Sequence, residues 1–163
     1  MNPIIKILPE RKLIGKHLTM SITGDRTSEL WKSFMPAWKE IRNSLTTNLF
    51  SLKVYDKSFR IEDLDTNTVF EKWAAVEVAD INSIPDGMEA FILPEGLYAV
   101  FHYKGLSTDD TIFRYIFGTW LPTSNFVVDN RPHFEILGEK YKNNDPESEE
   151  EICIPVRMRN AED

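Results

Sequence analysis

The sequence predicts an α+β fold in which one strand–helix–strand–strand unit is written twice. The tetrapeptide Ile-Leu-Pro-Glu occurs at residues 7–10 and returns 85 positions later at residues 92–95. An amphipathic helical pattern follows each copy, and two strand-like segments follow each helical pattern. Several elements that recur in one order indicate an internal duplication. We therefore expect a single domain, residues 1–163, built from half-units 3–80 and 88–157.

The first half-unit opens with residues 3–22, whose mixed apolar and polar pattern predicts a strand interrupted near Pro9. A helix is predicted over residues 29–45, where apolar side chains recur at steps of three or four. Pro36 lies inside this pattern and removes one backbone hydrogen bond, which predicts a kink or a helix in two pieces. The apolar positions of the helix are Leu30, Phe34, Trp38, Ile41 and Leu45. Residues 50–57 and 70–78 then read as strands on either side of a polar loop.

The second half-unit repeats this order. Residues 88–105 predict a strand interrupted at Pro94, and a helix is expected over residues 111–121. Ser107 and Thr108 can cap its start. Its apolar positions Ile112, Ile116 and Trp120 repeat the spacing of the first helix, and strands are predicted at residues 133–141 and 150–157.

Joining two such units builds one larger antiparallel sheet, because each half alone has too small a core to be stable. The fold expected is therefore a pseudo-twofold symmetric α+β domain, with two helices on one face of the sheet. We expect a ligand groove on the other face, since ligands favour concave boundaries between structural units.

Composition excludes several classes of protein. The formal net charge is −7 and the isoelectric point is about 5.0, which argues against a direct nucleic-acid surface, since that requires clustered Lys and Arg. The sequence contains no run of about 18 apolar residues, the length that a membrane-spanning helix needs. The first residues also lack the apolar core of a signal peptide. A soluble, cytoplasmic protein is expected.

No cofactor or metal site is expected from the sequence. Cys153 is the single cysteine, so an intrachain disulfide cannot form. His17, His102 and His133 are far apart and lack metal-ligand spacing. No glycine-rich phosphate loop or nucleophile elbow occurs.

Five segments carry a resemblance to a known family: FEKWAAVEV (70–78), LYAVFHYKG (97–105), TWLPTSNF (119–126), RPHFEIL (131–137) and EICIPV (151–156). In their order and spacing the chain resembles a GyrI-like small-molecule-binding domain, the effector-binding module of AraC- and MerR-type regulators, over about residues 3–157. The resemblance implies that Glu135 is the central acidic residue of the ligand groove. Leu137 and Cys153 stand where the family usually carries aromatic residues, which favours a groove that has smaller walls or is wider.

Strand alternation gives an independent prediction for Glu135. It puts Glu135 on one face of its strand and puts Phe134 and Ile136 on the other. On the strand 70–78, Ala74, Val76 and Val78 are expected to face the helices. Trp73 and Glu77 are then expected to face the groove, and Cys153 appears as the counterpart of Trp73 in the second half. A carboxylate between aromatic walls predicts a cation site.

Other aromatic residues are weaker candidates. Tyr55, Phe101 and Tyr103 lie on strands whose facing the pattern leaves open, and Trp120 lies on a helical stripe that is more typical of a core. Cys153 fits a small groove or core position. The predicted ligand-binding residues are Glu135, Trp73, Tyr55, Phe101, Tyr103, Trp120 and Cys153.

The leading functional hypothesis is a stand-alone binder of amphipathic cationic or electrophilic small molecules. No helix-turn-helix fits before residue 3 or after residue 157, so direct operator contact is not expected. Two alternatives follow from the resemblance: hydrolysis of cyclopropane-containing toxins with Glu135 as general base, and protein inhibition of the DNA gyrase type. A protein partner or a homodimer also fits the sequence.

Overall fold

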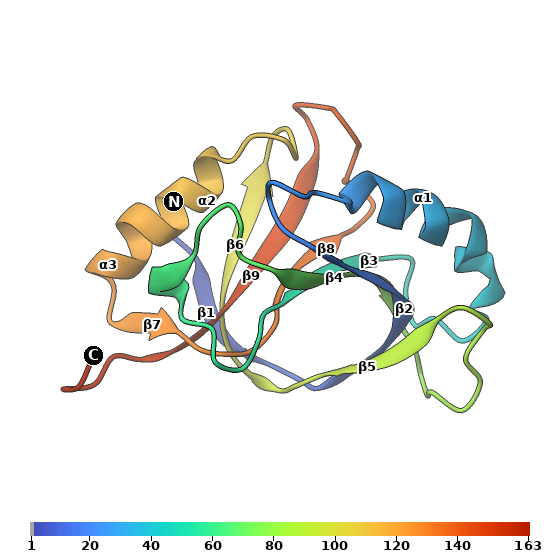
Figure 1. The fold of residues 1–163 in the computed structure, drawn as a ribbon, viewed down its shortest axis with the longest axis horizontal. Coiled ribbons are helices and arrows are strands. Elements are labelled where there is room, and N and C mark those ends of the chain that lie inside the picture. Colours follow the sequence, from blue (N-terminus) through green and yellow to red (C-terminus); the bar gives the residue numbers. More distant parts are fainter. Residues whose placement is uncertain (1) are drawn as a thin grey trace.

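The computed structural model describes residues 2–163 and contains an antiparallel sheet with two helical segments (Figure 1). The strand order is β1-β6-β9-β8-β3-β4-β2-β5, and β7 pairs with the outer part of β9. This confirms the predicted fold class. The strands are β1 (Ile4–Leu8), β2 (Arg11–Met20), β3 (Leu49–Val54), β4 (Phe70–Glu77), β5 (Glu89–Leu93), β6 (Gly96–Lys104), β7 (Phe126–Val128), β8 (His133–Leu137) and β9 (Glu149–Met158).

The first helical segment is shorter than predicted. Helix α1 (Thr27–Ala37) ends one residue after Pro36 and continues as the single 3-10 turn η1 (Trp38–Glu40). Leu30 and Phe34 are the buried residues of this helix, whereas Leu45 is 56% exposed and lies beyond it. The predicted proline break is therefore confirmed, but the stripe extends only as far as Ile41.

The second helical segment runs without interruption through α2 (Thr111–Tyr115), the π-helical stretch η3 (Ile116–Trp120) and α3 (Leu121–Thr123). Its start is stabilised by Asp109, whose carboxylate accepts hydrogen bonds from the backbone N–H and the hydroxyl of Thr111 at 2.9 and 2.6 Å. The prediction that Ser107 and Thr108 cap this helix is wrong, because both precede the turn and the N-cap position is occupied by Asp110. Among the described residues no helix is both long and apolar enough to cross a membrane.

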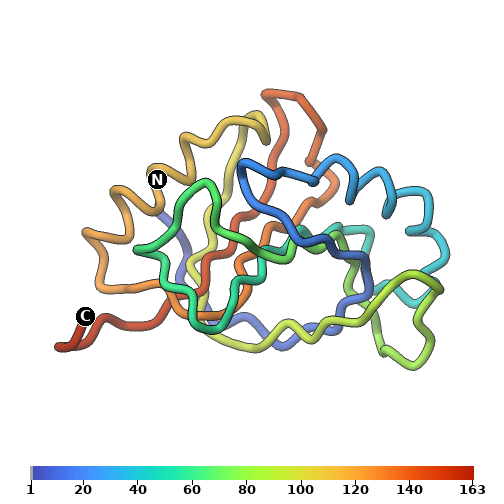
Figure 2. The backbone as a smooth tube through the Cα atoms, viewed as in Figure 1, coloured from blue at the N-terminus to red at the C-terminus, as the bar shows by residue number. Residues whose placement is uncertain are grey.

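The two half-units exchange their first strand segments. Each long strand breaks at its Ile-Leu-Pro-Glu copy: β1 pairs with β6 of the second half, and β5 pairs with β2 of the first. Ile4 lies opposite Val100, and the equivalent pair is Glu89 opposite Gly15, in which Glu89 lies 85 residues after Ile4 and Gly15 lies 85 residues before Val100. Figure 2 shows the two long strands passing along the lower edge of the molecule.

The pseudo-twofold axis passes between β3 and β8, where Ser51 lies opposite Glu135. These residues are 84 positions apart and are each other's counterparts. The registers also pair His17 with Trp73 and the equivalent His102 with Glu151. The predicted equivalence of Trp73 with Cys153 is therefore wrong, because the strand β4 maps onto β9 with an offset of 78.

The core divides into three clusters. One lies between the sheet and α1, and one between the sheet and the α2–α3 segment. The third fills the opposite face, where the long crossing strands curl underneath the sheet (Figure 1). Its members include Leu13, Phe50, Leu93, Tyr98 and Phe134. The expectation of a groove on this face is wrong, because side chains from the exchanged strands fill it.

Candidate ligand-binding site between the two helices

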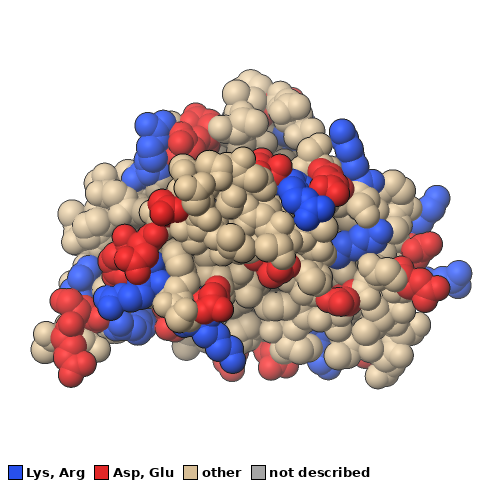
Figure 3. Space-filling view, in the orientation of Figure 1, with Lys and Arg blue, Asp and Glu red and all other residues tan. Residues whose placement is uncertain are grey.

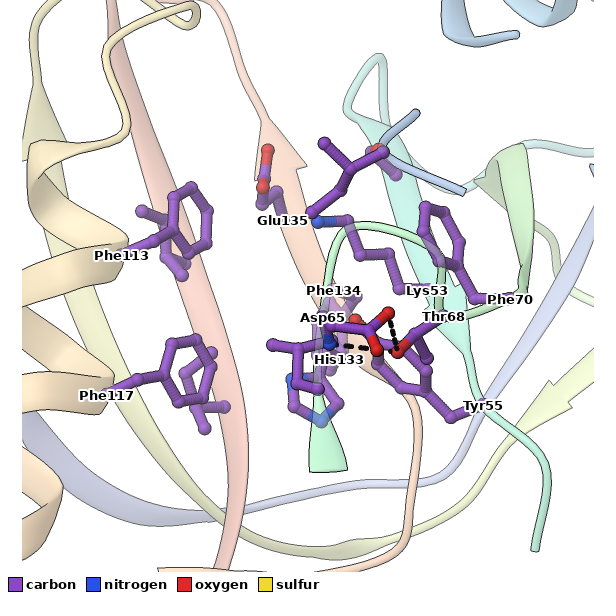
Figure 4. A pocket seen from close by; sticks show the side chains of 15 residues that line it. Lys53, Tyr55, Asp65, Thr68, Phe70, Phe113, Phe117, His133, Phe134 and Glu135 are labelled. Carbon is purple, nitrogen blue, oxygen red and sulfur yellow. Dashed lines mark hydrogen bonds between the residues drawn. The ribbon is translucent and has the colours of Figure 1, made fainter. Parts of the chain in front are cut away.

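The pocket that contains Glu135 lies on the helix-bearing face of the sheet, between the two helical segments (Figure 4). Its volume is about 140 Å³. The floor comes from β3, β8 and β9, one wall from α2 and η3, and the other from β4 and the loop that precedes it. The lining residues are Ile22, Ser51, Lys53, Tyr55, Leu64, Asp65, Thr68, Phe70, Phe113, Phe117, His133, Phe134, Glu135, Ile152 and Ile154.

Aromatic rings face each other across this pocket. Phe113 and Phe117 are four residues apart and so project from one side of the helix. Opposite them lie Phe70 of β4 and Tyr55, which directly follows β3 (Figure 4). Tyr55 is held by stacking on Phe59, with ring centroids 4.4 Å apart. The pocket therefore offers flat apolar surfaces from two independent elements.

Lys53 of β3 places its ammonium group between two of these rings. The Nζ atom lies 5.4 Å from the centroid of Phe70 and 5.6 Å from that of Phe113, and it points toward Glu135 (Figure 4). Within residues 2–163, Nζ has no hydrogen bond and no ion pair within 4.0 Å. Burial, assisted by repulsion from Lys72, lowers the pKa of Lys53, and the charge of Glu135 only partly opposes this.

Glu135 is half-buried on β8 and has a second carboxyl group as its neighbour. Glu150 of β9 is 7% exposed, and its Oε2 atom has no hydrogen-bond partner among the described residues. Burial first, and then the negative charge and hydrogen bond of Glu135, raise the pKa of Glu150 to about 8. Near neutral pH, Glu150 is therefore mostly protonated beside Glu135.

Two polar residues that line the pocket, His133 and Tyr55, carry no charge near neutral pH. Burial, with repulsion from Lys53, lowers the pKa of His133 to about 3, so the imidazole is neutral. Burial raises the pKa of the Tyr55 phenol to about 12. These two groups can donate or accept hydrogen bonds without carrying charge.

The segment between β3 and β4 covers the pocket. Leu64, Asp65 and Thr68 from this segment line it, and the turn is held by a 3.0 Å hydrogen bond from the backbone N–H of Asp65 to the hydroxyl of Thr68. The 3-10 turn η2 (Ile61–Asp63) contributes Ile61 and Glu62 to the lining of a wider neighbouring cleft of about 660 Å³. Both cavities share the lining residues Tyr55, Leu64, Phe117 and His133.

Of the predicted ligand-binding residues, the structure brings Glu135 and Tyr55 together in this pocket. Phe101, Tyr103 and Trp120 instead pack in the core beneath the second helical segment. Trp120 meets Phe101 edge to face at 5.2 Å, and the hydroxyl of Tyr103 donates a 2.7 Å hydrogen bond to the carbonyl of Leu106.

Trp73 and Cys153 lie in the cluster on the opposite face of the sheet. Trp73 contacts Phe91 and His17, while Cys153 is fully buried, which raises the pKa of its thiol to about 12. The predicted common cavity for Trp73 and Glu135 is therefore wrong. Alternation correctly placed Trp73 away from α1, but Glu135 faces the helices.

Sequence reasoning missed Lys53, Phe70, Phe113 and Phe117. The two helical phenylalanines each follow a buried isoleucine, Ile112 or Ile116, and so lie at the border of the buried stripe. Lys53 shares a strand face with Ser51 and Tyr55, since all three are two residues apart. Once Glu135 is known to pair with Ser51, alternation predicts that Lys53 faces the same side of the sheet as Glu135.

Three comparisons relate the chain to known proteins. It is 26% identical over 150 residues to the transcriptional regulator BrlR of Pseudomonas aeruginosa, covering 91% of this chain but 53% of the relative. The chain thus spans about half the length of that curated relative. The fold matches that of SAV2435 bound to tetraphenylphosphonium, with a TM-score of 0.63, 16% identity and coverage of 96% and 94% of the two chains.

It also matches EcmrR in a complex with DNA, with a TM-score of 0.69, 18% identity and coverage of 96% of this chain and 57% of EcmrR. The family model for the GyrI-like small molecule binding domain matches residues 1–157. This match agrees with the duplicated sheet and with the pocket between its helices. The chain therefore belongs to the family of GyrI-like small molecule binding domains.

Proposed function

We propose that the pocket beside Glu135 binds a small amphipathic compound with a flat aromatic part. The observation that supports this is the pair of aromatic walls formed by Phe113 and Phe117 on one side and Phe70 and Tyr55 on the other. Aromatic surfaces with a few polar groups between them are typical of ligand pockets. The loop at Leu64 and Thr68 would close over the bound molecule.

The charge of the preferred ligand follows from Lys53. The related SAV2435 was solved with tetraphenylphosphonium, an aromatic cation. In this chain the Lys53 ammonium already lies between Phe70 and Phe113, where a ligand cation would gain its cation–π contacts. Of the cationic and electrophilic ligands predicted from the sequence, we therefore favour neutral electrophilic compounds.

We further propose that ligand binding serves regulation or sequestration in a bacterial cytoplasm. BrlR is a regulator and EcmrR was solved with DNA. In a longer protein, ligand binding to this domain would therefore change how an attached segment binds DNA. As a separate chain it would buffer the compound. On the face shown in Figure 3, Lys and Arg lie among Asp and Glu, which gives this face no concentrated positive field for phosphates.

Thermal unfolding with a neutral and a cationic naphthyl probe tests the binding proposal. Naphthylmethanol, which is neutral, should raise the melting temperature more than naphthylmethyl-trimethylammonium. Phe113→Leu should weaken the shift, while Phe91→Leu, on the opposite face of the sheet, should leave it unchanged. Equal loss in both variants, or no shift with either probe, would contradict a site between the helices.

Hydrolysis of strained rings is a second candidate, favoured by the acid–base groups beside the pocket. Glu135 can accept a proton from water, and the protonated Tyr55 phenol lies in the same pocket. Incubation with a cyclopropane-containing electrophile, followed by mass spectrometry, should show a mass gain of one water that is lost in Glu135→Gln. Gyrase inhibition remains a prediction of the resemblance alone.

A further inference from the structure

We propose that Lys53 captures aromatic aldehydes in this pocket as a Schiff base, so that the ligand class includes carbonyl compounds held by a covalent, reversible bond. This inference rests on the proposed function, because the aldehyde must first enter the pocket. It goes further by assigning a nucleophile to a site so far described only through its walls and its carboxylate.

The geometry around Lys53 supports this role. Its Nζ atom lies within the cavity rather than in the core, and it is held between the Phe70 and Phe113 rings at 5.4 and 5.6 Å. No described residue accepts a hydrogen bond from it, so the nitrogen is not committed to a structural contact. Burial lowers the pKa of the Lys53 ammonium, so a larger fraction of the amine is neutral than in water, and the neutral amine is the nucleophilic form.

The pocket also supplies the remaining parts of the reaction. The neutral amine attacks the carbonyl carbon, a C–N bond forms, and the proton released from nitrogen passes to the former carbonyl oxygen. Loss of one water then gives the imine, so that aldehyde and amine become imine and water. Glu135, toward which Nζ points (Figure 4), can carry the proton between nitrogen and oxygen.

The aromatic walls favour aldehydes attached to flat rings. A ring seated against Phe117 and Tyr55, beside the space that Lys53 occupies, would present a carbonyl group on its edge to Nζ. Exclusion of water by the covering loop would slow hydrolysis of the imine.

Reductive trapping tests the inference. The protein is incubated with naphthaldehyde and sodium cyanoborohydride, and the modified lysine is located by peptide mass mapping. A single dominant adduct on Lys53 is expected. Lys53→Arg keeps the positive charge without the nucleophilic amine and should lose that adduct. Lys39→Arg, which removes an exposed lysine, should keep it.

Naphthylmethanol separates this inference from the proposed function, because it fills the pocket without a carbonyl group. If the alcohol raises the melting temperature of wild type and Lys53→Arg while the aldehyde labels exposed lysines equally, covalent capture is overturned and the binding proposal stands. If the alcohol has no effect and Lys53 is not labelled, both are overturned. Selective labelling of Lys53 in folded protein supports capture.

Discussion

The imidazole of His17 stacks on the indole of Trp73, with ring centroids 4.4 Å apart and an interplanar angle of 23°. Both nitrogens of that imidazole meet carboxylates: Nδ1 lies 2.8 Å from Glu71 and Nε2 lies 2.5 Å from Glu89. Partial burial lowers the pKa of His17, but the hydrogen bonds with the two glutamates outweigh it and raise the pKa. The charged ring thus ties three strands together.

This arrangement predicts a pH-dependent stability. The folded protein keeps its proton on His17 above the unfolded value of about 6.5, so the stabilisation is fully present below that pH. It is lost as the pH rises through the raised folded pKa. The free energy of unfolding, measured with urea across this window, should fall more steeply in wild type than in His17→Gln. His102→Gln, at the symmetry-equivalent position, is the control, and an unchanged slope in His17→Gln would refute the prediction.

His133 predicts the opposite dependence on pH. Its folded pKa of about 3 lies below the unfolded value, so protonation favours unfolding as the pH falls below about 6.5. Between pH 7 and pH 4.5 this single group should cost about 2–3 kcal/mol of stability. His133→Phe should remove that part of the acid sensitivity, as measured by urea unfolding at both pH values. The same acid loss in His133→Phe would mean that other groups cause it.

Glu135→Gln should change the titration of Glu150. The charge of Glu135 helps to raise the pKa of Glu150 to about 8, although burial is the larger cause. Without that charge, the pKa of Glu150 should fall but stay above its ordinary value. Carboxyl carbon NMR of the two proteins measures this directly. An unchanged pKa would show that burial alone holds the proton.

Lys53→Met should convert the pocket into a cation site. The substitution removes the ammonium group from between Phe70 and Phe113 and leaves Glu135 without the positive charge near it. A ligand cation would then gain cation–π contacts worth about 2 kcal/mol, which corresponds to about ten- to thirtyfold tighter binding. Calorimetry with naphthylmethyl-trimethylammonium measures the change, and naphthylmethanol serves as the neutral control. A cation affinity equal to that of wild type would disprove this role of Lys53.

Gly15 and Gly118 predict opposite responses to alanine. A Cβ atom on Gly15 would lie 2.7 Å from the Cα atom of Ala75 on the neighbouring strand and would also clash with the carbonyl of Ala74. Gly15→Ala should therefore destabilise the sheet by about 1–3 kcal/mol or more. Gly118→Ala meets open space in a helical stretch and should be neutral or stabilising by up to about 1 kcal/mol. Thermal unfolding of the two variants provides the comparison.

The strands were largely predictable because their apolar residues alternate. The same order of elements in both halves also supports each strand assignment. The breaks at Pro9 and Pro94 fall where the sequence places them. Strand β7 was missed because three residues are too few to show a period. The first helix was predicted too long because Leu45 continues the spacing of the stripe although it is exposed.

The candidate site was only partly predictable. Alternation correctly separated Glu135 from Phe134, but it could not say which face of the sheet would be filled. That outcome depends on the crossing strands, which cover Trp73 and Cys153 and leave the space between the helices open. Lys53 was not predicted as a site residue, because a lysine on a strand is usually solvated. Only the pairing of Ser51 with Glu135 shows that Lys53 faces the pocket.

The reciprocal pairing of β1 with β6 and of β5 with β2 has a consequence for symmetry. Two identical units that swapped their first strands in this way would form a symmetric dimer, in which the residues on the axis are the same. Because one chain carries both units here, the equivalent positions on the axis hold different residues, Ser51 and Glu135. The pocket therefore has one acidic side, which a symmetric dimer could not provide.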